Sequence, residues 1–260
     1  MRTASRIRSY RRLWIPDLAV LLLLGVVALI LFSNACLELR IQDALYRGWG
    51  QGTDLHKAWP AGEMPPWNWV REYGPWPAIA TGIASFLALI GSAWKRSLAR
   101  YRIHCLFLVL SLLLGPGLVV NVIAKPWFGR PRPRQIERYG GTLAYQPPFA
   151  RSTAPGCRSF PSGHASTGFY FVAFYFLFRT RRGARKWCGL ACGVVLGAFI
   201  GYARMLAGGH FLSDVVWSFL AVAAVELLLY YFVLNVPASE EQSSAPTPGS
   251  CPPARARAGA

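Results

Sequence analysis

Six runs of apolar residues that approach the length of a transmembrane helix constrain this chain more than any other feature of its sequence. A helix needs about 20 largely apolar residues to cross the hydrocarbon core of a bilayer. Helices suit that environment because they satisfy their backbone hydrogen bonds internally. The runs cover residues 13–32, 77–94, 103–123, 164–178, 187–202 and 212–234. We therefore expect an all-α fold, an integral membrane bundle of six transmembrane helices.

The first run, residues 13–32, could instead belong to a cleaved signal peptide, because five arginines precede it. The apolar core of a signal peptide spans about 7–15 residues. This run is longer, so we interpret it as a retained helix.

The runs place residues 1–236 in one membrane domain and leave residues 237–260 as a tail. The tail contains mainly Pro, Ser, Glu, Ala and Arg, a composition typical of disorder. Residues 34–75 are polar and rich in Trp, Pro and Gly, which suits the headgroup region. Within them, residues 37–46 predict a short interfacial helix.

The distribution of Lys and Arg predicts the orientation of the bundle. Cytoplasmic loops of membrane proteins carry an excess of basic residues. The N-terminus, residues 95–102 and residues 179–186 carry five, four and five of them, and all three lie on one side of an even-numbered bundle. We expect both termini, including the disordered tail, to be cytoplasmic.

One loop, residues 124–163, breaks this pattern, because it carries seven basic residues and a single Glu on the opposite side. The chain as a whole has a net charge of +17, which suits nucleic acid, anionic lipid or an anionic substrate. The apolar runs and the lack of a zinc-finger or RNP-like pattern argue against nucleic acid. A plain basic surface loop is the alternative; we favour an anion site.

Three polar segments fall at the predicted non-cytoplasmic helix ends. They are Lys125–Pro133 (KPWFGRPRP), Phe160–His164 (FPSGH), and Arg204 followed by His210 and Asp214. Phosphoryl transfer needs cations and donors around the phosphate oxygens, a nucleophile in line, and an acid for the leaving oxygen. These segments supply all three kinds of group.

Each segment alone has a simpler explanation. His210 and Asp214 are four residues apart, so on a helix they would share one face and could form an ordinary polar contact. Pro161–His164 could be a helix cap, and the Arg-Pro repeat a stiff loop. Ionisable groups at membrane helix ends are costly to keep, so their joint presence on one face predicts a functional site.

The segments closely resemble the type 2 phosphatidic acid phosphatase (PAP2) and haloperoxidase superfamily. Its pattern is K-x6-RP, PSGH and SR-x5-H-x3-D, and the resemblance covers about residues 75–235. Here the pattern appears in order as Lys125-x6-Arg132-Pro133, Pro161-Ser162-Gly163-His164 and Ala203-Arg204-x5-His210-x3-Asp214. Ala203 replaces the usual Ser, which removes one hydroxyl from the expected phosphate cradle.

The resemblance implies a role for each matching residue. His210 would attack phosphorus and form a phosphohistidine, His164 would protonate the leaving alcohol, and Asp214 would orient His210. The phosphate-binding residues would be Lys125, Arg132, Ser162, Gly163 and Arg204. No metal and no other cofactor are implied.

The sequence indicates the identity of the substrate less directly than the type of reaction. Residues 128–140 and 157–166 look like the bacterial lipid A phosphatase branch, which implies a lipid phosphate substrate, a bacterial inner membrane and an active site facing the periplasm. Undecaprenyl diphosphate and phosphatidylglycerol phosphate are competing substrates, and a lipid phosphotransferase could use the same phosphohistidine. An inactive membrane scaffold or transporter is the non-enzyme alternative. The sequence leaves open the oligomeric state and whether Cys36 and Cys157 pair.

Overall fold

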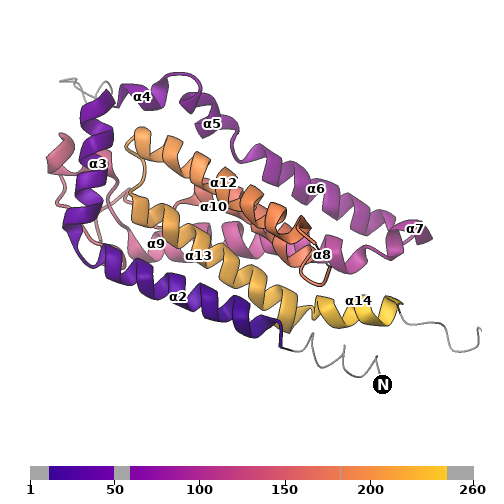
Figure 1. The fold of residues 1–260 in the computed structure, drawn as a ribbon. Coiled ribbons are helices and arrows are strands. Elements are labelled where there is room, and N and C mark those ends of the chain that lie inside the picture. Colours follow the sequence, from indigo (N-terminus) through magenta and orange to yellow (C-terminus); the bar gives the residue numbers. More distant parts are fainter. Residues whose placement is uncertain (1–11, 50–58, 182, 245–260) are drawn as a thin grey trace, which may run out of the picture.

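The computed structural model describes residues 12–49, 59–181 and 183–244, and these residues form an elongated bundle of helices (Figure 1). No strand occurs among them; a single isolated bridge joins Ile136 to Leu143. The expected all-α fold is confirmed. The main apolar helices are α2 (Trp14–Phe32), α6 (Trp76–Gly91), α8 (Arg102–Leu112), α12 (Arg185–Leu206) and α13 (Leu212–Leu228).

Shorter segments extend two of these helices. Helix α8 continues through η1 (Leu113–Ala124), a π-helical stretch that contains Pro116, into α9 (Lys125–Phe128). Proline has no N–H to donate, so a change of helix type at this position accommodates it without breaking the helix. Helix α13 continues into η5 (Leu229–Val233).

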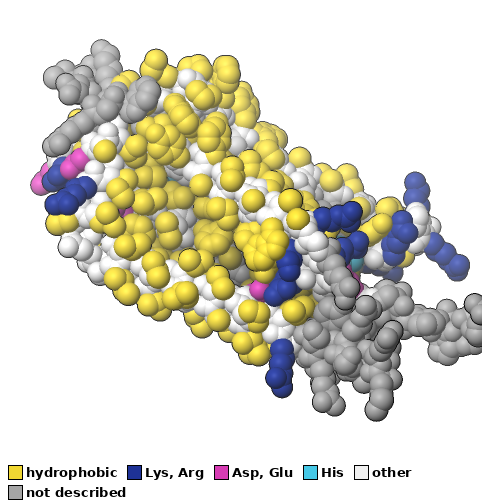
Figure 2. All heavy atoms as spheres, viewed as in Figure 1, with side chains coloured by type: hydrophobic (Ala, Val, Ile, Leu, Met, Phe, Trp, Pro, Cys, Tyr) yellow, Lys and Arg dark blue, Asp and Glu magenta, His cyan; other side chains and the backbone are white. Residues whose placement is uncertain are grey.

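Five stretches of the described chain are long and apolar enough to cross a membrane: 14–32, 67–91, 102–135, 185–206 and 212–233. They overlap five of the six predicted spans, although 67–91 begins before the predicted 77–94 and 102–135 ends after the predicted 103–123. Apolar side chains cover most of the visible flank of the bundle, and Lys and Arg side chains gather toward its ends (Figure 2). This distribution is the one expected of a protein whose flank contacts lipid.

The predicted span at 164–178 has a different form. It consists of α10 (Gly163–Phe169), η4 (Tyr170–Val172) and α11 (Ala173–Leu177), which are 7, 3 and 5 residues long and largely buried. At about 1.5 Å per residue they are shorter than a bilayer core. The segment still runs between the two ends of the bundle, because Ser162 N bonds Asp214 O at one end and Arg179 bonds Asp17 at the other. The six-span topology stays a prediction.

Close backbone contact holds α10 in the centre of the bundle. A Cβ on Gly168 would lie 2.6 Å from the Cα of Gly197 in α12, so neither position leaves room for a side chain. Small residues permit such close approach between membrane helices, where dispersion contacts and not the hydrophobic effect hold the helices together. The approach fixes the position of the Pro-Ser-Gly-His segment at the start of α10.

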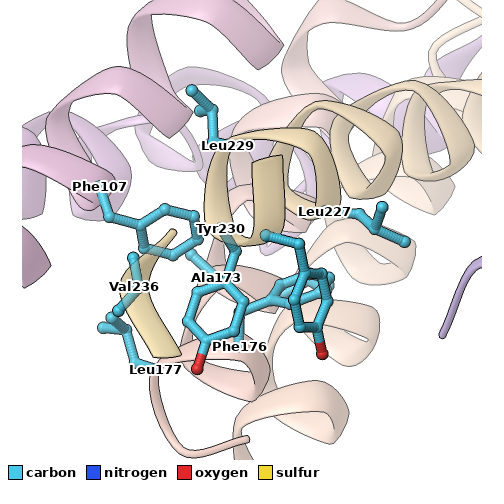
Figure 3. Packing of buried hydrophobic residues seen from close by; sticks show 10 residues of the cluster. Phe107, Ala173, Phe176, Leu177, Leu227, Leu229, Tyr230 and Val236 are labelled. Carbon is cyan, nitrogen blue, oxygen red and sulfur yellow. The ribbon is translucent and has the colours of Figure 1, made fainter. Parts of the chain in front are cut away.

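An aromatic cluster closes the end of the bundle opposite the polar segments. Phe107, Phe176, Tyr230 and Val236 are buried together there, and Figure 3 shows these side chains from α8, α11, η5 and α14 packed against one another. Helix α14 (Val236–Ser244) corrects the expectation that a disordered tail begins at residue 237. Residues 245–260 lie outside the described residues, and disorder there stays a prediction.

The other end is covered by α3 (Ala35–Trp49), which runs across the ends of α12 and α13 (Figure 1). It contains the short helix predicted at 37–46. Its buried Gln42 Nε2 donates to Met205 O at 3.2 Å, so the helix is fixed to the end of α12. The remaining elements are α4 (Pro60–Glu63), α5 (Trp67–Tyr73), α7 (Arg96–Ala99), η2 (Pro133–Gln135) and η3 (Glu137–Tyr139).

Candidate active site

Backbone hydrogen bonds bring the three polar segments together at the end covered by α3. Ser159 N donates to Arg130 O at 2.9 Å, which joins the second segment to the first. Ser162 N donates to Asp214 O at 3.0 Å, and Arg134 N donates to Gly208 O at 3.1 Å. The third segment therefore contacts both of the others, as the sequence pattern predicted.

The first segment turns sharply after α9. Gly129 has φ 58°, in the left-handed region that favours glycine at a helix end, and a Cβ there would meet Ser152 O at 2.5 Å. Because of this turn the chain leaves the helix axis immediately after the last turn of α9. Lys125 remains on the helix, while Arg130 and Arg132 enter the loop beside the other two segments.

Lys125 and the start of α10 lie against each other. A Cβ on Gly163 would lie 2.6 Å from Lys125 Nζ and 2.3 Å from Asn121 Oδ1. Lys125 Nζ also donates to Asn121 Oδ1 at 2.9 Å. Ser162 caps the helix, since its Oγ accepts from Ala165 N at 3.4 Å. Sequence reasoning missed Asn121, although a polar residue one helical turn before Lys125 in an apolar run was a usable signal.

His210 and Asp214 are paired, but not on one helix face as expected. His210 precedes α13, and its Nδ1 lies 3.4 Å from Asp214 Oδ2, a contact longer than an ordinary hydrogen bond. Asp214 instead closes the N-terminus of α13, where its Oδ2 accepts from Phe211 N at 2.8 Å. The contact therefore follows from helix capping and not from helical periodicity.

Both side chains are buried, with His210 1% and Asp214 0% exposed. Burial lowers the pKa of His210 to about 4, while the nearby Asp214 carboxylate acts in the opposite direction. The sequence could not decide between these two effects. The outcome is a neutral imidazole at neutral pH, as a nucleophile requires.

Arg132 and Arg204 each carry a buried donor that has no acceptor. The Nε atoms of both guanidinium groups are buried and lack any hydrogen-bond partner within the described part of the chain. Buried polar atoms are usually paired, so two guanidinium donors without a partner in the protein are available to bind a ligand. Both side chains also act electrostatically on His164, together with Lys125 and His210. A guanidinium with unused donors beside two histidines suits an anion such as phosphate.

Several expectations concern groups at the edge of this site. Ala203 is fully buried in α12, so the family hydroxyl is replaced by a methyl group in a closed environment. Cys36 is exposed and Cys157 is buried, and neither forms a disulfide. No group of three or more His, Cys, Asp or Glu side chains with the geometry of a metal site occurs within the part of the chain described here.

Comparison with known proteins decides the family. The model of the PAP2 superfamily matches residues 104–237, which contain all three polar segments. This chain belongs to the PAP2 superfamily. The resemblance expected from the sequence motifs is confirmed.

Three proteins similar to this chain carry related names. The chain is 39% identical over 153 residues to a lipid A 4'-phosphatase of Francisella tularensis subsp. novicida, in a match that covers 58% of this chain and 66% of the relative. It is 38% identical over 119 residues to a lipid A 4'-phosphatase of Rhizobium leguminosarum, covering 44% of this chain and 48% of the relative. It is 36% identical over 101 residues to a lipid A 1-phosphatase of Rhizobium johnstonii, covering 38% of this chain and 36% of the relative.

The chain thus matches less than two thirds of the length of these relatives. No solved structure matches the chain at a significant level.

Proposed function

We propose that this chain is a membrane phosphatase that removes phosphate from a lipid headgroup, with a lipid A-type molecule as its substrate. The single observation that carries the proposal is the pair of buried Arg132 and Arg204 donors without acceptors, beside His210 and His164. The names of the relatives support the choice of lipid A, because both 4'- and 1-phosphatases are among them.

In the first step, His210 forms a bond to phosphorus. Its Nδ1 faces Asp214, so Nε2 is the nitrogen that attacks, and the lone pair is available because the ring is neutral. Burial and the neighbouring cations favour a neutral His164, and the negative charge of the bound phosphate opposes them, so His164 takes up a proton when the substrate binds. The bond between phosphorus and the lipid oxygen breaks, and His164 donates this proton to that oxygen. The products of this step are a lipid alcohol and a phosphohistidine.

In the second step, water attacks the phosphohistidine. His164, now neutral, takes a proton from the water, the bond between phosphorus and Nε2 breaks, and inorganic phosphate leaves. In both steps the phosphate oxygens are held by five groups: the guanidinium groups of Arg132 and Arg204, the ammonium of Lys125, the Ser162 hydroxyl and the Gly163 amide. Such contacts stabilise charge that is redistributed over those oxygens in the transition state.

We place the site on the periplasmic side of a bacterial inner membrane, with both termini in the cytoplasm. The support is the distribution of basic residues in the sequence, where residues 95–102 and 179–186 carry four and five Lys and Arg. Helix α7 and the connection between α11 and α12, which belong to these two segments, lie at the end of the bundle opposite the site (Figure 1). A lipid headgroup could then reach the three segments from the outer leaflet.

A product analysis on defined lipids tests this proposal. The purified protein in nanodiscs is incubated in parallel with lipid A, undecaprenyl diphosphate and phosphatidylglycerol phosphate, and the products are identified by mass spectrometry. We expect lipid A to lose one phosphate fastest, and His210→Ala to release none. Transfer of phosphate to an added alcohol instead of water would identify a phosphotransferase, and no phosphate loss from any lipid would refute the proposal.

A further inference from the structure

Arg130 differs from the other cations of the 124–163 loop because it is fully buried and fully paired. It is 0% exposed, and its Nη1 donates to Asp214 Oδ1 at 2.7 Å. Its Nη2 donates to Glu38 Oε2 at 2.6 Å. The guanidinium also lies 4.5 Å above the centre of the Phe211 ring, which shields it from water. Arg130 cannot bind the substrate phosphate in this arrangement, since both of its terminal nitrogens are occupied.

Glu38 comes from α3 and lies outside the residues that match the superfamily model, which begin at 104. It is 1% exposed and is held from three directions. Its carboxylate accepts from Arg130, from the Tyr145 hydroxyl at 2.6 Å, and from Ser213 N at 3.1 Å, and it also bonds the Ser213 hydroxyl. The N-terminus of α13, which carries Asp214, is thereby tied to α3.

This arrangement determines how the Asp214 carboxylate is oriented. Arg130 occupies Oδ1, so the carboxylate cannot rotate freely, and Oδ2 is left toward His210 Nδ1. Ser159 Oγ donates to the same Oδ2 at 2.5 Å. Arg130 lies between the two carboxylates, so each of these buried groups has an ion-pair partner, as burial of charged groups requires.

We propose that Glu38 and Arg130 are positioning residues for the phosphatase reaction, acting through Asp214 on the nucleophile His210. The active site of this chain is then incomplete without α3. The inference rests on the proposed function. Glu38 acts on His210 through three successive contacts, by way of Arg130 and Asp214, and not on the substrate, so its removal lowers kcat and leaves KM nearly unchanged.

The test compares Glu38→Gln with Asp43→Asn in the full-length protein in nanodiscs. Both changes remove one carboxylate from α3, and Asp43 pairs with Arg138 away from Asp214. We expect Glu38→Gln to lower kcat about 10- to 100-fold, the size expected for loss of a charged hydrogen bond, and Asp43→Asn to stay within about twofold of wild type. Equal kcat in Glu38→Gln and wild type would overturn the inference.

A double-mutant cycle separates positioning from a general loss of structure. If Glu38 acts through Asp214, adding Glu38→Gln to Asp214→Asn should lower kcat by less than about twofold beyond the loss caused by Asp214→Asn alone. The same 10- to 100-fold loss in both backgrounds would overturn the inference, because the effect would then not pass through Asp214.

A second variant applies if Glu38→Gln does not yield a folded, monodisperse protein. Arg130→Lys keeps the charge but cannot bridge two carboxylates, so we expect lower kcat with KM preserved, and wild-type kcat would overturn the inference. A wild-type protein that releases no phosphate from any lipid would refute the proposed function instead.

Discussion

The two ends of the bundle both contain partly buried arginines, and the difference between their hydrogen-bond partners separates a structural ion pair from a binding site. At the end with the aromatic cluster, Arg179 Nε and Nη2 both donate to Asp17, at 2.9 and 3.1 Å. Tyr175 and Tyr231 donate to the same carboxylate, at 2.8 and 2.6 Å. At the other end, Arg132 and Arg204 have buried donors with no acceptor.

This difference indicates what each set of charges is for. The Asp17–Arg179 group is complete within the protein, so its role is to hold α2 against α11 and η5. The group around Arg132 and Arg204 is incomplete, and an anion would complete it. Residues of the Asp17–Arg179 group should therefore affect stability, and residues of the group around Arg132 and Arg204 should affect turnover.

The largest expected effect is that of His210→Ala. Without the nucleophile the covalent route is closed, and we expect turnover of the lipid substrate to fall by about 10⁴-fold or more. Phosphate release by the purified variant, compared with the wild type, measures this fall in turnover. Residual turnover above a few per cent would show that another group attacks phosphorus.

His164→Ala should depend on the leaving group. Loss of a general acid costs about 10²–10⁴-fold for a poor alcohol leaving group. Nitrophenyl phosphate needs little protonation of its leaving oxygen, so its turnover should fall much less. The ratio of the two losses is the measurement, and equal losses would remove His164 from the role of acid.

Arg132→Ala and Arg204→Ala should each lower kcat by about 10²–10³-fold, because each removes a charge-assisted contact that strengthens in the transition state. Arg132→Lys should recover only part of the loss, since an ammonium cannot grip phosphate with two parallel bonds. Steady-state kinetics on the lipid substrate test this, and near-wild-type kcat in either alanine variant would exclude that arginine.

Asp17→Asn is the matched change in the Asp17–Arg179 group. It should lower the free energy of unfolding by about 2–4 kcal/mol, because Arg179 loses its charged partner in a largely buried site. The kcat of the folded fraction should not change. Thermal unfolding in detergent and active-site titration measure the two effects. A loss of kcat without a loss of stability would contradict the purely structural role of the Asp17–Arg179 group.

The smallest expected effect concerns pH. Since burial lowers the pKa of His210 from 6.5 to about 4, its imidazole should stay neutral throughout the range from pH 7 to pH 5. Protonation of His210 should then limit the free enzyme only as the pH approaches 4. Selective ¹⁵N-histidine NMR, with His210→Ala for assignment, follows this titration directly. Half-protonation of His210 near pH 6.5 would contradict it.

The sequence predicted the convergence of the three segments because motif spacing and the alternation of loops place them at the same helix ends. It predicted the wrong geometry for His210 and Asp214, since it inferred a shared helix face from their spacing although the last apolar run, like α13, begins only at Leu212. The partnership of Glu38 with Arg130 could not be read at all. The two residues are 92 positions apart, and only the packing of α3 brings them into contact.

The extent of the membrane spans and of the C-terminal tail was less predictable than the positions of the motifs. The segment at 164–178 is apolar because it is buried among other helices. Burial in protein and burial in lipid both favour apolar residues, so the sequence does not distinguish this segment from a lipid-facing span. Helix α14 was missed because its polar composition resembles that of a disordered tail, whereas Val236 is buried and Glu240 contacts His104 Nε2 at 2.8 Å.

Trapping of the phosphoenzyme tests the central claim most directly. The wild-type protein and the His210→Ala, His164→Ala and Arg179→Gln variants are mixed with ³²P-labelled substrate, quenched within milliseconds, and digested to locate the label. The account predicts an acid-labile, base-stable phosphate on His210 in the wild type and Arg179→Gln, and none in His210→Ala. Label on any other residue, or label that persists in His210→Ala, would contradict it.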